Sequence, residues 1–161
     1  MLRLGLSYRV EELVPHRGAM SLLDSIDEYG EDWLRASLTT RPTSTFTDAH
    51  GVPGWVGIEY MAQAAAAFAG IEQAQRGEQA SIGLLIGSRY YRWMAGSTFE
   101  IIPFGTKLVV EARLALRDEE DFAAYDCTLS AQGQRIAECT LKAYRPRDIR
   151  PFLPPPEDSG G

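Results

Sequence analysis

Hydrophobic and polar residues alternate with a period of two along three segments in the C-terminal half of the chain. In residues 107–117 the even-numbered positions from 108 to 116 are apolar, and charged residues stand between them. Residues 122–131 and 135–144 repeat the alternation, and turn-forming residues separate the three segments. This pattern is typical of strands with one buried face and one wet face. It predicts a three-stranded antiparallel meander.

The second hairpin of this meander makes a prediction about the two cysteines. A loop centred on Gly133 would place Cys127 directly opposite Cys139, on the apolar side of the hairpin. We interpret the pair as two reduced core residues, with a redox role as the alternative. Two cysteines in a chain with no secretion signal indicate neither a disulfide framework nor a zinc site.

One strong helix is predicted in the middle of the chain. Residues 56–75 are rich in Ala and contain no Pro, and the segment ends just before Arg76-Gly77. The dipeptide Pro53-Gly54 marks its start. Residues 56–71 are apolar nearly all round, which predicts an enclosed helix rather than a surface helix.

Further strands are predicted on both sides of this helix. Residues 22–29 and 33–39 resemble a hairpin before it, and residues 82–94 resemble a long strand after it. Residues 1–150 therefore predict a single α+β domain, in which about five or six mostly antiparallel strands wrap a long helix. Residues 151–161 contain four prolines and no periodicity, so we expect an extended or disordered tail.

Composition and charge narrow the classes of protein. The chain has 161 residues, of which 45% are hydrophobic and 24% charged, as in globular domains. A net charge of -6 argues against a nucleic-acid partner or an anionic membrane surface. No run approaches the ~18 apolar residues of a membrane span, and the N-terminus does not resemble a secretion signal. We therefore expect a cytoplasmic protein. We also expect no metal and no cofactor, and the two His and two Cys are too scattered along the chain to bind a metal ion together.

Two polar residues interrupt the apolar helix. Glu59 and Gln63 are four residues apart, so they share one helical face. The other residues of that face, Ala62, Ala66 and Gly70, are small, which predicts the close approach of a sheet. Burial shifts a carboxyl group toward its protonated form, which suits a general acid or base. The alternative is a partly solvated Glu that the helix dipole stabilises.

The loop before the helix adds a second chemical group. His50 lies nine residues before Glu59, in a stretch rich in Gly and Pro. The backbone N–H groups of Gly54 and Trp55 at the start of the helix could polarise a carbonyl group. By helix rise, Glu59 is only ~7.5 Å along the axis from Gly54. A base, an acid and an oxyanion-type donor pair could thus reach one substrate. The alternative is that His50 is an incidental surface residue.

Gly57 is unusual for the first turns of a helix, where Gly costs ~1 kcal/mol relative to Ala. One hypothesis is that its bare Cα makes room for a substrate at the helix start. The alternative is that a neighbouring strand packs too closely there for a methyl group.

At these residues the sequence resembles a known family. Residues 52–64, Val-Pro-Gly-Trp-Val-Gly-Ile-Glu-Tyr-Met-Ala-Gln-Ala, resemble the segment that begins the central helix of hotdog-fold 3-hydroxyacyl-carrier-protein dehydratases. Pro-His-Arg at residues 15–17 is similar to the N-terminal signature of that family, in which the His, here His16, looks structural. The resemblance covers roughly residues 10–145 and is closest to the dehydratases associated with aryl-polyene biosynthesis.

The resemblance implies a hotdog fold and a dimer with its sites at the interface. It also implies dehydration of a 3-hydroxyacyl thioester to the trans-2-enoyl thioester. His50 would remove the α-proton, N–H groups of Gly54 or Trp55 would polarise the thioester, and Glu59 of the partner subunit would protonate the leaving hydroxyl. Gln63 would orient Glu59. The chain departs from the family at His50, because the Gly-His-Phe-Pro segment is absent and the spacing to Glu59 is shorter.

Partners and alternatives follow from the same resemblance. The substrate would arrive on an acidic acyl carrier protein, for which Arg89, Arg92 and Arg76 are candidate contacts. The dimer would be a homodimer or a heterodimer with another hotdog subunit. One alternative function is a hotdog acyl thioesterase, in which the helix carboxylate activates water and His50 is dispensable. The other is a non-catalytic hotdog subunit that completes an active dehydratase.

Overall fold

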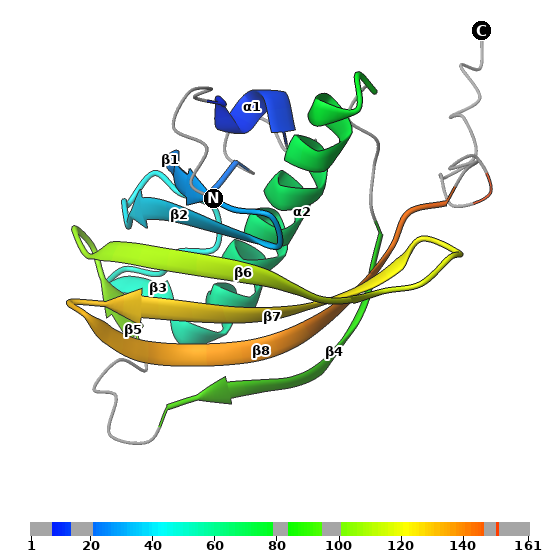
Figure 1. The fold of residues 1–161 in the computed structure, drawn as a ribbon. Coiled ribbons are helices and arrows are strands. Elements are labelled where there is room, and N and C mark those ends of the chain that lie inside the picture. Colours follow the sequence, from blue (N-terminus) through cyan, green and yellow to red (C-terminus); the bar gives the residue numbers. More distant parts are fainter. Residues whose placement is uncertain (1–7, 14–20, 79–83, 95–100, 147–150, 152–161) are drawn as a thin grey trace, which may run out of the picture.

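A long helix packed against a curved antiparallel sheet dominates the molecule (Figure 1). The computed structural model describes residues 8–13, 21–78, 84–94, 101–146 and 151. The predicted α+β architecture is confirmed. The helical elements are α1 (Val10–Leu13), the 3-10 turn η2 (Gly54–Val56) and the long helix α2 (Gly57–Gln75).

The main sheet has six strands in the order β1-β2-β6-β7-β8-β4, with every neighbouring pair antiparallel. The strands are β1 (Ser25–Tyr29), β2 (Trp33–Thr39), β4 (Leu84–Trp93), β6 (Lys107–Arg117), β7 (Phe122–Ala131) and β8 (Gln134–Tyr144). A separate two-stranded sheet pairs β3 (Gly51–Pro53) with β5 (Ile101–Pro103). The predicted meander is β6, β7 and β8, and β8 begins one residue before its predicted start.

The first hairpin is shorter than predicted. We expected a strand from Leu22, whereas β1 begins at Ser25. The reason lies in the backbone of Leu22, whose N–H donates to the side-chain oxygen of Gln63 on α2 at 2.9 Å. A backbone donor that bonds a helix side chain cannot also join the sheet ladder. Leu22 is still buried, so the segment belongs to the core although not to the sheet.

Cys127 and Cys139 face each other across β7 and β8, as predicted. Both are buried free thiols, and the Sγ atom of Cys139 lies 3.0 Å from Met61 Sδ of α2. A hydrogen bond with Cys139, together with burial, raises the pKa of the Cys127 thiol. Raised pKa and burial both suppress the reactive thiolate. The arrangement favours the interpretation as two core residues.

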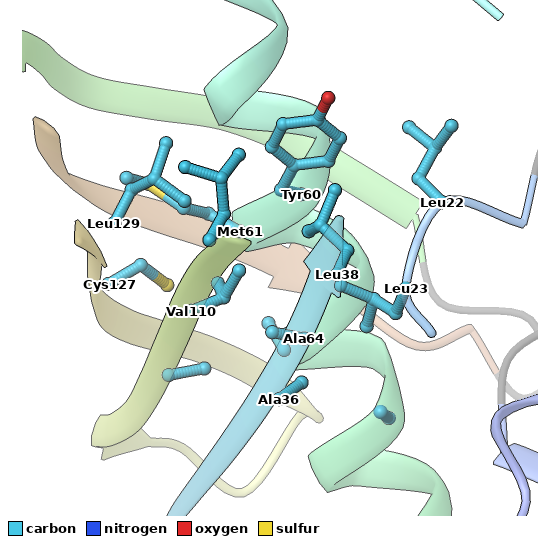
Figure 2. Packing of buried hydrophobic residues seen from close by; sticks show 14 of the residues in the cluster. Leu22, Leu23, Ala36, Leu38, Tyr60, Met61, Ala64, Val110, Cys127 and Leu129 are labelled. Atoms are coloured by element: carbon cyan, nitrogen blue, oxygen red, sulfur yellow. The ribbon is translucent and has the colours of Figure 1, made fainter. Parts of the chain in front are cut away.

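The core fills the space between α2 and the concave side of the sheet. Figure 2 shows Met61 and Ala64 of α2 lying toward Leu38 of β2 and Val110 of β6. Each of these four side chains is at most 4% exposed. Burying a side chain of Leu or Met size contributes about 1.5–3 kcal/mol, so this layer holds α2 to the sheet.

The single chain encloses most of α2 but leaves one stripe partly exposed. The stripe consists of Ile58, Ala62, Ala66 and Ala69, at the helical spacing of three and four residues. At Gly70, on the same side, α1 rather than a sheet makes the close approach, since a Cβ there would lie 2.5 Å from the Leu13 carbonyl oxygen. The expected approach of a sheet to this face was therefore wrong at Gly70. We name Ile58, Ala62, Ala66 and Ala69 the α2 stripe.

Tyr60 makes the fold sensitive to alkaline pH. Its side chain is 2% exposed, and burial raises its pKa from 10.0 to about 12. As the pH rises, the unfolded chain therefore loses this proton before the folded chain does. The contribution of Tyr60 to the free energy of unfolding is complete below pH ~10 and is lost as the pH rises toward 12. We expect urea unfolding at several pH values to show this loss, and Tyr60→Phe to weaken it. An unchanged alkaline slope in the variant would contradict the assignment to Tyr60.

Candidate active site

His50 lies in an exposed turn that Asp48 closes. The backbone N–H groups of His50 and Gly51 donate to Asp48 Oδ1 at 2.7 and 3.0 Å. The Asp48 N–H in turn donates to the Gly51 carbonyl oxygen at 2.9 Å. Asp48 was not among the predicted site residues, although an Asp two residues before His50 is a recognisable signal for such a turn. The side chain of Asp48 thus fixes the backbone that carries His50.

Strand β3 connects this turn to the start of the helix. Gly51 pairs with Pro103 of β5, and a Cβ at Gly51 would collide with the carbonyl oxygen of Ile102. Glycine is therefore required for the two strands to meet. The two-stranded sheet was not predicted, because strands of three residues are too short to show a period. Its strand β3 is the whole connection between His50 and the first turn of the helix.

The helix begins as the 3-10 turn η2 and continues as α2. The N–H groups of its first turn have no acceptor within the helix itself. Gly54 is buried, whereas Trp55 is 61% exposed and lies with its ring 6.0 Å from that of Phe46, edge to face. The Gly54 carbonyl oxygen accepts a hydrogen bond from the hydroxyl of Tyr91 on β4 at 2.5 Å. The predicted donors at Gly54 and Trp55 thus lie on a turn that is tied to the sheet.

Glu59 and Gln63 are in contact on the next turns of α2. Gln63 is fully buried, and its Nε2 donates to Glu59 Oε1 at 3.2 Å. Its Oε1 accepts the Leu22 N–H at 2.9 Å. Because a backbone N–H can only donate, this second bond fixes which end of the amide faces Glu59. Glu59 itself is only partly buried in the single chain.

The space at Gly57 is filled by side chains of the sheet. A Cβ at Gly57 would lie 2.5 Å from the Tyr91 hydroxyl and 3.0 Å from Leu129 Cδ2. This geometry favours close packing over the hypothesis that the bare Cα admits substrate. The bare Cα of Gly57 is therefore in close contact with the core.

Gly57→Ala is expected to lower the melting temperature and the activity together. Forcing a methyl group into a filled core costs about 1–3 kcal/mol, and here it displaces the Tyr91 hydroxyl that holds the helix start. Gly87→Ala is the matched control, because a Cβ there meets no atom within 4 Å. A Gly57→Ala protein with the wild-type melting temperature but reduced activity would instead support direct substrate contact.

Two predicted features lie outside the residues that the structure describes. His16 and its Pro-His-Arg motif fall within residues 14–20, and the tail falls within residues 152–161 apart from residue 151.

Among the residues that the structure describes, no group of three or more His, Cys, Asp or Glu side chains could hold a metal ion. Within the same ranges, none of the helices is long and apolar enough to cross a membrane.

Comparison with solved structures defines the class of fold. The chain has the hotdog fold. It resembles a chain of the dehydratase heterocomplex ApeI:P from Xenorhabdus doucetiae, with 27% sequence identity and a TM-score of 0.79. The match covers 92% of this chain and 96% of that chain. The E. coli PaaI protein of the phenylacetic acid degradation operon matches at 14% identity and a TM-score of 0.55, over 74% of this chain and 81% of that protein. A hypothetical thioesterase with coenzyme A from Streptococcus pneumoniae matches at 8% identity and a TM-score of 0.56, over 75% of this chain and 84% of that protein. These last two show the fold alone.

The family follows from the sequence itself. Residues 8–154 match the ApeP-like family, described as ApeP dehydratase, and the chain belongs to that family. The resemblance to the aryl-polyene-associated dehydratases is thereby confirmed. Comparison with curated proteins finds no significant match.

Proposed function

We propose that the chain dehydrates a 3-hydroxyacyl thioester, carried on an acyl carrier protein, to the trans-2-enoyl thioester. Membership of the ApeP-like dehydratase family carries this proposal. The contact between Glu59 and Gln63 supports it, because an acid that protonates a leaving group must be held in a fixed orientation.

In the proposed reaction His50 and Glu59 act on two neighbouring carbons of the acyl group. His50 removes a proton from the α-carbon, and negative charge develops on the thioester oxygen. Backbone N–H groups of Gly54 or Trp55 stabilise that charge. Glu59 gives its proton to the hydroxyl on the β-carbon, which leaves as water as the double bond forms. Gln63 keeps Glu59 Oε1 as an acceptor, so the transferred proton is carried by the other carboxylate oxygen.

We infer further that His50 of one subunit acts with Glu59 of a partner subunit. Glu59 lies at the N-terminal end of the α2 stripe, which is apolar and partly exposed in the single chain. A second hotdog subunit on this face would cover the stripe and bring another loop toward Glu59. The partner is a second copy of this chain or a different hotdog subunit. The ApeI:P relative, described as a heterocomplex, supports the second form.

The carrier protein is proposed to dock on β4. Arg89 and Arg92 are exposed on this strand, beside the Tyr91 that contacts the helix start. Arg92 lies over the Tyr90 ring at 5.6 Å and 3.5 Å from Glu138. Arg76 is less suitable, because it follows the opposite end of α2, ~25 Å from Glu59 by helix rise.

A second candidate function is that of a non-catalytic subunit in a dehydratase heterocomplex, which the ApeI:P relative also favours. Formation of enoyl thioester, measured for the chain alone and with its hotdog partner, separates the two. We expect turnover that is lost in both His50→Ala and Glu59→Gln of this chain. Full turnover of the complex with both substitutions would show that this chain only supports its partner.

A further inference from the structure

Tyr91 joins the edge strand of the sheet to the first turn of the helix. Its hydroxyl donates to the Gly54 carbonyl oxygen at 2.5 Å, across 37 residues of sequence. The same oxygen accepts the N–H of Gly57. A carbonyl oxygen has two lone pairs, and these two donors use both of them. The Gly54 carbonyl is thus held from the strand and from the helix at once.

Holding this carbonyl also sets the direction of a neighbouring donor. The Gly54 carbonyl and the Trp55 N–H belong to one peptide unit, which is planar and trans. The two groups therefore point in opposite directions. Because Tyr91 and the Gly57 N–H fix the carbonyl, they also fix the direction of the Trp55 N–H. A donor bound to the carbonyl also polarises the unit, which strengthens its N–H as a donor.

We infer that Tyr91 is a positioning residue for the dehydration, which acts by orienting the Gly54–Trp55 peptide so that the Trp55 N–H faces the thioester oxygen. The inference rests on the proposed function. It also gives Gly57 a role, because a Cβ at Gly57 would lie 2.5 Å from the Tyr91 hydroxyl and displace it. The bare Cα thus makes room for the positioning hydroxyl.

The hydroxyl is suited to this task because it remains a donor. Burial raises the pKa of Tyr91 well above its ordinary value, and the neighbouring Cys139 and Tyr60 raise it further. The phenol therefore stays protonated through the neutral and mildly alkaline range.

Tyr91→Phe tests the inference, because it removes the hydroxyl and keeps the ring. The variant is assayed in its complete assembly, with its hotdog partner where one is needed. We expect its kcat for a 3-hydroxyacyl-carrier-protein substrate to be about tenfold below that of wild type, while KM stays within about twofold. A misdirected N–H destabilises the transition state, in which charge develops on the thioester oxygen, more than it weakens substrate binding. The change is therefore expected in kcat rather than in KM. Tyr144→Phe is the control, since it makes the same change on a partly buried tyrosine of β8, which pairs with the first residue of β4 and lies outside the proposed site. A kcat within about twofold of wild type in Tyr91→Phe would overturn the inference.

The backbone amide of Trp55 supplies a readout that needs no turnover. We expect its ¹H–¹⁵N resonance to shift and its hydrogen exchange to accelerate in Tyr91→Phe, with no change in Tyr144→Phe. An unmoved Trp55 resonance would overturn the positioning role whatever the kinetics show. Absence of dehydration by the wild-type assembly would overturn the proposed function instead, and the Trp55 amide would still decide whether Tyr91 sets its orientation.

Discussion

Replacing His50 by Ala is expected to reduce kcat/KM for dehydration by at least ~100-fold, because a positioned general base is worth that much or more. Glu59→Gln should cause a loss of similar size, since it removes the transferable proton. The double variant should be little worse than either single variant, because the two groups act in one reaction. The His50 side chain is exposed, so its loss should leave the melting temperature unchanged.

The control for this pair is Glu78→Gln, which removes an exposed carboxylate just beyond the far end of α2, where it pairs with Arg76. We expect wild-type kinetics for that protein. A His50→Ala protein that kept more than about a tenth of the wild-type rate would refute the assignment of His50 as the base.

Mixing two inactive variants should restore activity if the active assembly is a homodimer. A dimer of one His50→Ala chain and one Glu59→Gln chain has one site with both groups intact and one site with neither. About half of the dimers in an equal random mixture combine the two chains, so the rate should recover to roughly a quarter of wild type. This recovery is at least about 25-fold above either variant alone.

The measurement requires co-refolding or co-expression, followed by the steady-state rate. No recovery would contradict a site shared between two copies of this chain. A monomer by sedimentation at micromolar concentration that still turned over would contradict any shared site.

Local patterns predicted most of the fold. The period of two located β6, β7 and β8 nearly to the residue, because neighbouring strands joined by short turns pair in one register. The turn at Gln132 and Gly133, both with positive φ, pairs Ala131 with Gln134. A register shift between Leu129 and Ser130 then brings Cys127 opposite Cys139. The three-residue strands β3 and β5 left no periodic signal, so they appear only in the structure.

The candidate site was predictable where its residues share one helix. The spacing of Glu59 and Gln63 was sufficient to predict their contact, which the structure contains. The groups that hold this helix come from remote segments. Tyr91 bonds Gly54 across 37 residues, and the Leu22 N–H bonds Gln63 across 41. No period or spacing links such positions, so the sequence alone did not identify Tyr91 or the backbone of Leu22.

The most direct test of the central claim is the intact mass of a 3-hydroxyacyl carrier protein after incubation with the purified wild-type assembly. Dehydration predicts that the carrier keeps its acyl group and loses the mass of one water molecule, and that His50→Ala abolishes this loss. Release of the whole acyl group, with His50→Ala as active as wild type, would show a thioesterase and contradict the account.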